Sequence, residues 1–167
     1  MRIRTGDESD LTAVLALLDE ATAWMVSRGN TRQWGTEPWS DQPKKVDRTR
    51  ELITTGELWI TELDGAPVGA MIVSDQPMPY VKPVDEPELY VRMLVTSRRH
   101  AGKRIGEQLL AKARSEAVAK GVSLMRVDCF AGGAGELVRY YERNGFQRAG
   151  TFTSIQDWPG QVLSMRL

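Results

Sequence analysis

The chain has 167 residues, of which 41% are hydrophobic and 26% are charged, as is usual for a globular protein with a sizeable core. Its 22 basic and 22 acidic residues balance, so bulk attraction to nucleic acid or to an anionic membrane is not expected. The only cysteine, Cys129, excludes an internal disulfide and a multi-cysteine metal site. The N-terminus does not resemble a signal peptide and no run is long enough to span a membrane, so we expect one soluble, cytoplasmic domain over residues 1–167.

The first half of the chain predicts a strand, two helices and a hairpin. Apolar residues recur at helical spacing from Leu11 to Met25, and Asp7 or Ser9 can cap the start of this helix. Asp64 and Gly65 separate two apolar runs and are a strong hairpin signal. In chain order we expect a strand at 2–4, a helix at 11–25, a loop at 29–43, a helix at 46–55 and strands at 58–63 and 68–73.

The second half alternates strands and helices. Residues 75–87 contain four of the eight prolines and predict an irregular connection inside one domain. We then expect a strand at 89–95, a long helix at 105–118 stopped by Gly121, a strand at 124–129, a short helix at 136–144, and strands at 146–152 and 162–167. This order indicates a mixed α/β sheet with helices on its faces.

The turn between the expected strand at 89–95 and the long helix carries the strongest chemical signal. A helix N-terminus presents unpaired N–H groups and a partial positive charge, which suit a phosphate. Gly102 and Gly106 let the backbone approach a ligand closely. Cationic side chains cluster at the same point, namely Arg98, Arg99, Lys103 and Arg104. The turn therefore predicts a diphosphate site.

These residues resemble the signature of the GNAT superfamily of acyl-CoA-dependent N-acyltransferases, Gln/Arg-x-x-Gly-x-Gly/Ala between a strand and a helix. The signature falls on residues 101–106, where Gly106 matches while Ala101 and Arg104 depart from it. A second signature, a tyrosine shortly before Gly-Phe on the short helix, is met by Tyr141. The resemblance covers nearly the whole chain and is specific between residues 89 and 146.

The resemblance implies an α/β fold with a mixed, mostly antiparallel sheet, helices on both faces, and central strands at 89–95 and 124–129 that splay apart. It implies acetyl-CoA as acyl donor and no metal. The pantetheine arm would pair with the first splayed strand and the pyrophosphate would bind the following turn. The implied contacts are Met93, Leu94, Val95, Arg99, Ala101, Gly102, Lys103, Arg104, Ile105 and Gly106, with Arg98 a further candidate for the adenosine 3′-phosphate.

Acyl transfer to an amine needs a proton acceptor, a stabilised oxyanion and an acid for the departing thiolate. By resemblance, Tyr141 is the acid, and a backbone N–H between Met93 and Val95 would polarise the carbonyl. Glu88 and Asp128 are the candidates for the base, and either is equally interpretable as a structural residue of its strand. Cys129 is expected to be a small buried residue, not a nucleophile.

The amine acceptor, a small molecule or a peptide, is not identified by the sequence. A tryptophan-rich region after the first helix either lines the acceptor pocket or covers the core; its candidate residues are Trp24, Arg32, Gln33, Trp34, Glu37, Trp39 and Asp41. Two rival functions are a catalytically silent acyl-CoA-binding domain, suggested by Ala101 and Arg104, and a nucleic-acid-binding module, disfavoured by the neutral net charge. A homodimer through the last strand is possible by analogy.

Overall fold

The computed structural model describes all 167 residues and contains seven strands and four α-helices. The chain forms two compact units, one of residues 1–73 and 93–109, the other of residues 74–92 and 110–167. Strand β4 and helix α3 contribute to both. The predicted α/β class with a mixed, mostly antiparallel sheet is confirmed, because every described strand pair is antiparallel except β4 with β5.

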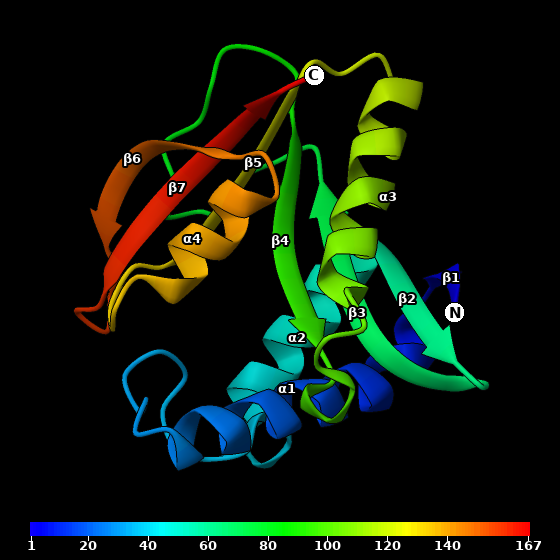
Figure 1. Cartoon of the computed structure of the whole chain (residues 1–167), viewed down its shortest axis with the longest axis vertical. Coiled ribbons are helices and arrows are strands. Elements are labelled where there is room, and N and C mark those ends of the chain that lie inside the picture. The colour runs from blue at the N-terminus through cyan, green and yellow to red at the C-terminus, as the bar shows by residue number, and fades with distance from the viewer. The chain divides into compact units, whose positions relative to one another are not determined.

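In the first unit the strands follow the order β1-β2-β3-β4 (Figure 1). Its elements are β1 (Arg2–Gly6), α1 (Leu11–Ser27), α2 (Pro43–Thr55), β2 (Glu57–Leu63), β3 (Ala66–Ser74), the end of β4 (Leu89–Thr96) and the start of α3 (Ile105–Ala119). The predicted hairpin is confirmed, since Leu63 pairs with Ala66 across the two-residue turn. Asp64 and Gly65 have φ angles of 52° and 80°, as the favoured hairpin turn requires at both positions.

Helices cover both faces of the first unit's strands, as the sequence predicts. One face presents Leu58, Ile60, Ala70 and Ile72 to α1 and α2, in a core cluster that includes the fully buried Leu18 of α1. The other face carries the first turn of α3, and a Cβ on Gly69 would lie 2.6 Å from the Ile105 side chain. Fully burying an aliphatic side chain stabilises the fold by about 1.5–3 kcal/mol, so this two-sided packing holds the start of α3 in place.

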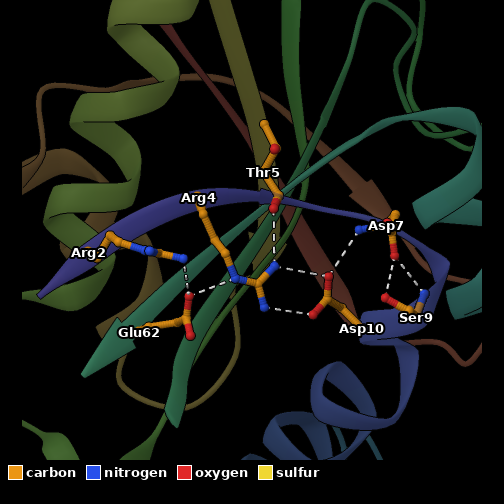
Figure 2. Close-up of polar contacts among 7 residues, drawn as sticks. All are labelled: Arg2, Arg4, Thr5, Asp7, Ser9, Asp10 and Glu62. Carbon is orange, nitrogen blue, oxygen red and sulfur yellow. Dashed lines mark hydrogen bonds and ion pairs between the residues drawn. The ribbon is translucent and has the colours of Figure 1, made fainter. Parts of the chain in front are cut away.

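A polar network joins the N-terminal strand to the turn that follows it (Figure 2). The Arg4 guanidinium donates to Glu62 Oε1 at 2.7 Å and to the two Asp10 oxygens at 2.8 and 3.2 Å. Asp7 accepts from the Ser9 N–H, and its own N–H donates to Asp10, so the two aspartates form a capping box. The cap predicted at Asp7 therefore serves a short 3₁₀ turn at Glu8–Asp10 that leads into α1.

In the second unit the strand order is β4-β5-β7-β6. Its elements are the start of β4, the later turns of α3, β5 (Leu124–Phe130), α4 (Glu136–Arg143), β6 (Gln147–Thr153) and β7 (Pro159–Arg166). The described β4–β5 pairing is parallel and joins Leu89 to Met125, Tyr90 to Arg126 and Val91 to Val127. Splaying of these strands beyond Val91 stays a prediction.

Three expected boundaries are wrong because proline occupies positions that tolerate it, and one of them is the start of β7, which is at Pro159 and not at residue 162. Helix α2 begins at Pro43, not at residue 46, since the first helical position needs no backbone N–H. Strand β3 begins at Ala66 and includes Pro67, beside the irregular pairing at Thr61 and Glu62. The expected loop at 29–43 contains one 3₁₀ turn, Trp39–Asp41. None of the helices combines the length and the apolar character needed to cross a bilayer.

Candidate active site

The turn after β4 is anchored at its base and exposed at its tip. The Ser97 N–H donates to the Val68 carbonyl at 2.8 Å, and the Ser97 hydroxyl donates to Glu20 of α1 at 2.9 Å. Glu20 also accepts the Arg99 N–H at 3.1 Å. These hydrogen bonds outweigh the effect of burial and hold the pKa of Glu20 below its usual range, so a carboxylate fastens the turn to α1. Residues 101–104 are exposed, while Ile105 and Gly106 are buried in the first turn of α3.

Two residues of this turn have a backbone in the left-handed region. Gly102 has a φ of 86°, and Arg104, at the position of the first of the signature's two glycines, has a φ of 58°. A side chain is disfavoured in this left-handed region, which glycine enters freely. Arg104 thus departs from the signature in side chain but adopts the glycine conformation. It delivers the chain into α3, whose first N–H groups have no intrahelical acceptor.

The four cationic side chains of the turn are held differently. The Arg98 guanidinium lies 3.7 Å from the centre of the Trp24 ring of α1. Arg99 approaches Glu20 at 3.5 Å, and Arg104 pairs with Glu107 at 3.0 Å. Lys103 is exposed. Arg99, Lys103 and Arg104 therefore surround the exposed backbone, whereas Arg98 is committed to packing on α1.

The predicted pantetheine-binding residues lie at the end of β4. Val95 is buried in the core cluster of the first unit, while Met93 is partly buried against it and Leu94 is half-buried. Nothing in the structure tests their role toward a cofactor, so it stays a prediction.

Tyr141 lies in the second unit, on α4, and is buried. Its ring makes edge contacts with Tyr140 and Phe146, at centroid distances of 5.3 and 5.7 Å. Burial, followed by the neighbouring Cys129 thiol, raises the pKa of Tyr141 well above 10.0. The phenol is therefore protonated at neutral pH, which is the state that an acid or a hydrogen-bond donor needs. Burial also raises the pKa of Cys129 to about 12, so this thiol is not a thiolate nucleophile.

Asp128 lies near the end of β5 and accepts hydrogen bonds from two phenols. Tyr80 donates to Oδ1 at 2.9 Å and Tyr90 donates to Oδ2 at 2.5 Å. Burial raises the pKa of Asp128, against the opposing effect of the two tyrosines and Arg126. A raised pKa brings a carboxylate closer to the range in which it is an effective base. Because side chains alternate along a strand, Asp128 and Cys129 point to opposite faces of β5.

Glu88, the other candidate base, is 4% exposed, and both of its carboxylate oxygens accept hydrogen bonds from Arg126. Arg126 Nε donates to one carboxylate oxygen at 2.5 Å and Nη2 donates to the other at 2.9 Å. A bidentate buried pair of this kind leaves neither oxygen available for an amine. The geometry thus favours a structural role for Glu88. Asp128, in contrast, accepts hydrogen bonds from two phenols and is not held by a guanidinium.

The tryptophans after α1 pack within the first unit. Trp34 and Trp39 form an edge contact at 5.2 Å and lie against the core cluster. The Lys45 ammonium lies 4.7 Å above the Trp39 ring. This arrangement favours the core-covering interpretation for both residues. Glu37 and Asp41 are exposed.

Sequence reasoning missed three residues that shape these sites: Glu20, Tyr80 and Tyr90. None of them carried a local signal, since the partner of each lies far away in the sequence. Tyr90 shares the strand face of Asp128 because it pairs with Arg126 in the β4–β5 register, which the structure shows. The structure contains no group of three or more histidine, cysteine or carboxylate side chains able to hold a metal ion.

The comparisons with known proteins agree with this geometry. The acetyltransferase (GNAT) family model matches residues 19–146. An acetyltransferase of the GNAT family from Listeria monocytogenes has a similar structure, with a TM-score of 0.74 and 22% identity over 99% of this chain and 94% of that one. The PaiA N-acetyltransferase of Thermoplasma acidophilum, solved with coenzyme A, gives a TM-score of 0.73 and 17% identity over 99% and 98% of the two chains.

YncA of Salmonella typhimurium, solved with acetyl-CoA, is similar at a TM-score of 0.69 and 16% identity, over 100% of this chain and 94% of that one. No curated protein sequence matches the chain. At these identities the structural likeness concerns the fold, while the family model spans both the turn at 97–106 and Tyr141. The chain therefore belongs to the GNAT family of acetyltransferases.

Proposed function

We propose that the protein transfers an acetyl group from acetyl-CoA to a primary amine by direct attack in a ternary complex. The observation that carries this proposal is the turn at residues 97–106, which combines exposed cations with a glycine-type backbone before α3. Such a turn suits a pyrophosphate. Similar proteins solved with acetyl-CoA or coenzyme A support the same donor. A small-molecule or peptide acceptor, a cytoplasmic location and a homodimer are parts of the proposal.

In the proposed reaction, one residue accepts the proton that leaves the amine and another donates a proton to the departing thiolate. The amine nitrogen attacks the thioester carbonyl, whose oxygen is polarised by a backbone N–H in Met93–Val95. Asp128 accepts a proton from the nitrogen as the N–C bond forms, directly or through water. The C–S bond then breaks, and the thiolate takes a proton from the Tyr141 hydroxyl. The raised pKa of Asp128 and the protonated state of Tyr141 support these roles.

The donor site is tested by thermal unfolding with acetyl-CoA, coenzyme A, dephospho-coenzyme A and ATP. A ligand at a hundredfold excess over its Kd adds ~2.7 kcal/mol, which for a chain of this size raises the Tm by roughly 5–10 °C. We expect this shift with acetyl-CoA and coenzyme A, a weaker one with dephospho-coenzyme A, and none with ATP. The absence of a shift with acetyl-CoA would overturn the donor assignment.

The transfer itself is tested by release of free coenzyme A thiol in the presence of a broad panel of primary amines. We expect amine-dependent release that is lost in Asp128→Asn. Binding of acetyl-CoA without release for any amine would favour a catalytically silent acyl-CoA-binding domain.

A further inference from the structure

The two phenols that bind Asp128 differ in the exposure of their side chains and in the segment that carries them. Tyr90 comes from β4 and is 0% exposed, whereas Tyr80 comes from the irregular connection at 75–87 and is 51% exposed. We propose that Asp128 Oδ1 is the atom that receives an N–H of the acceptor amine, and that Tyr80 is an exchangeable positioning residue that occupies this oxygen until the amine arrives. This inference rests on the proposed role of Asp128 as the proton acceptor.

The bond to Oδ2 is fixed by its surroundings. Tyr90 lies in the paired part of β4, opposite Arg126 of β5. Its ring packs in a cluster with Val81 and Val162, and the Arg126 guanidinium lies 5.4 Å from its centre. A buried phenol that lost this carboxylate would be left without its partner, which is costly in a core. Tyr90 therefore holds the carboxylate in one orientation and leaves Oδ1 as the oxygen that can change partners.

The bond to Oδ1 comes from an exposed side chain on a segment whose backbone is anchored on both sides. On one side of Tyr80, Arg92 donates to the Gln76 and Pro77 carbonyls at 3.0 and 3.1 Å. On the other side, the buried Val81 is followed by Lys82, whose carbonyl accepts from Arg126 at 3.1 Å. The backbone is thus anchored on both flanks. The oxygen opens when the exposed Tyr80 side chain, whose ring centroid lies 5.1 Å from that of Phe152, rotates away from it.

The chemistry of the site selects a nitrogen donor. An ionised carboxylate only accepts hydrogen bonds, so whatever replaces the Tyr80 hydroxyl must donate one. Asp128 forms no ion pair, because the nearby Arg126 guanidinium is bound to Glu88. A primary ammonium or amine supplies both the donor and, when charged, the missing countercharge. The groups that face Asp128 are Tyr80, Tyr90 and Arg126, and of these only Tyr80 donates to Oδ1.

The binding test uses protein labelled with ¹³C at the aspartate carboxyl, with Asp128→Asn identifying the Asp128 resonance. The probes are propylammonium, which carries N–H donors, and tetramethylammonium, which carries the same charge without a donor. We expect propylammonium to shift the Asp128 signal and tetramethylammonium to leave it unchanged. Tyr80→Phe keeps the ring against Phe152 and removes the competing hydroxyl, so propylammonium should bind about fivefold more tightly, as expected for one hydrogen bond of ordinary net strength.

Tyr90→Phe is the matched control, because it removes the other phenol and leaves the Tyr80 hydroxyl on Oδ1. It should not tighten propylammonium binding. With an amine that supports thiol release, Tyr80→Phe should lower the acceptor KM about fivefold, whereas a merely structural tyrosine would leave KM unchanged or raise it. Equal propylammonium affinity in wild type and Tyr80→Phe, or an equal response to both cations, would overturn the inference. If the ammonium binds as expected but no amine releases thiol, the catalytic proposal fails while the amine site stands.

Discussion

The left-handed conformation of Arg104 gives a quantitative test of the turn. We compare Arg104→Gly with Arg104→Ala, since both remove the exposed ion pair to Glu107 and differ only in the Cβ. A Cβ in the left-handed region costs roughly 1–2 kcal/mol. The glycine variant also has a more flexible unfolded chain, which lowers its stability relative to the alanine variant by about 0.4–1 kcal/mol. The glycine variant should therefore be the more stable by about 1 kcal/mol, the reverse of the usual order in a regular element.

The assay is thermal and urea unfolding of both variants without ligand. For a chain of this size 1 kcal/mol corresponds to roughly 2–4 °C in Tm. Gly102→Ala is a control in the same turn: φ is 86° and no atom lies within 4 Å of the added Cβ, so its destabilisation would be purely conformational. If Arg104→Ala were as stable as Arg104→Gly, Arg104 would not be in the left-handed region, and the turn would lack the glycine-type backbone proposed for pyrophosphate binding.

Three further outcomes follow from the structure. Tyr141→Phe should lower kcat about 100-fold or more while leaving the acetyl-CoA-induced Tm shift intact, because the acid is lost and the binding surface is kept; equal turnover would remove Tyr141 as the acid. Glu88→Gln should destabilise the fold by about 3–5 kcal/mol in urea unfolding, since it leaves Arg126 as an uncompensated buried charge. The double variant Glu88→Leu with Arg126→Met should recover most of that loss, and no recovery would show that the pair is not the cause. Asp10→Asn should destabilise the protein at pH 7. The hydrogen bond from Arg4, opposed by burial, lowers the Asp10 pKa, so its contribution is present above the unfolded pKa of about 3.9 and lost as pH falls through the folded value. The difference in urea midpoint between wild type and Asp10→Asn should therefore shrink below about pH 4, and a constant difference would contradict the linkage.

Local signals were enough for the elements and for naming candidate residues in one half of the proposed site. Apolar spacing predicted α1 and α3, glycine stops marked the ends of α2 and α4, and Asp64-Gly65 predicted the hairpin, because these features depend on neighbours within a few residues. The basic turn and Tyr141 were recognisable for the same reason: a motif in one strand–turn–helix segment carries its own geometry. Even Arg104, which breaks the signature, has a left-handed backbone, a conformation that glycine enters freely.

The choice between the two carboxylates depended on contacts that no local pattern encodes. Glu88 and Asp128 look alike in sequence, each near one end of a strand, yet one is locked by Arg126 and the other is shared by two phenols. Those partners lie 38 to 48 residues away along the chain. Strand register and the path of the proline-rich connection bring them together, and the pKa of a carboxylate is set by the charges and donors around it in space. The tertiary structure, not the residue type, therefore decides which carboxylate is held in an ion pair and which accepts hydrogen bonds from phenols alone.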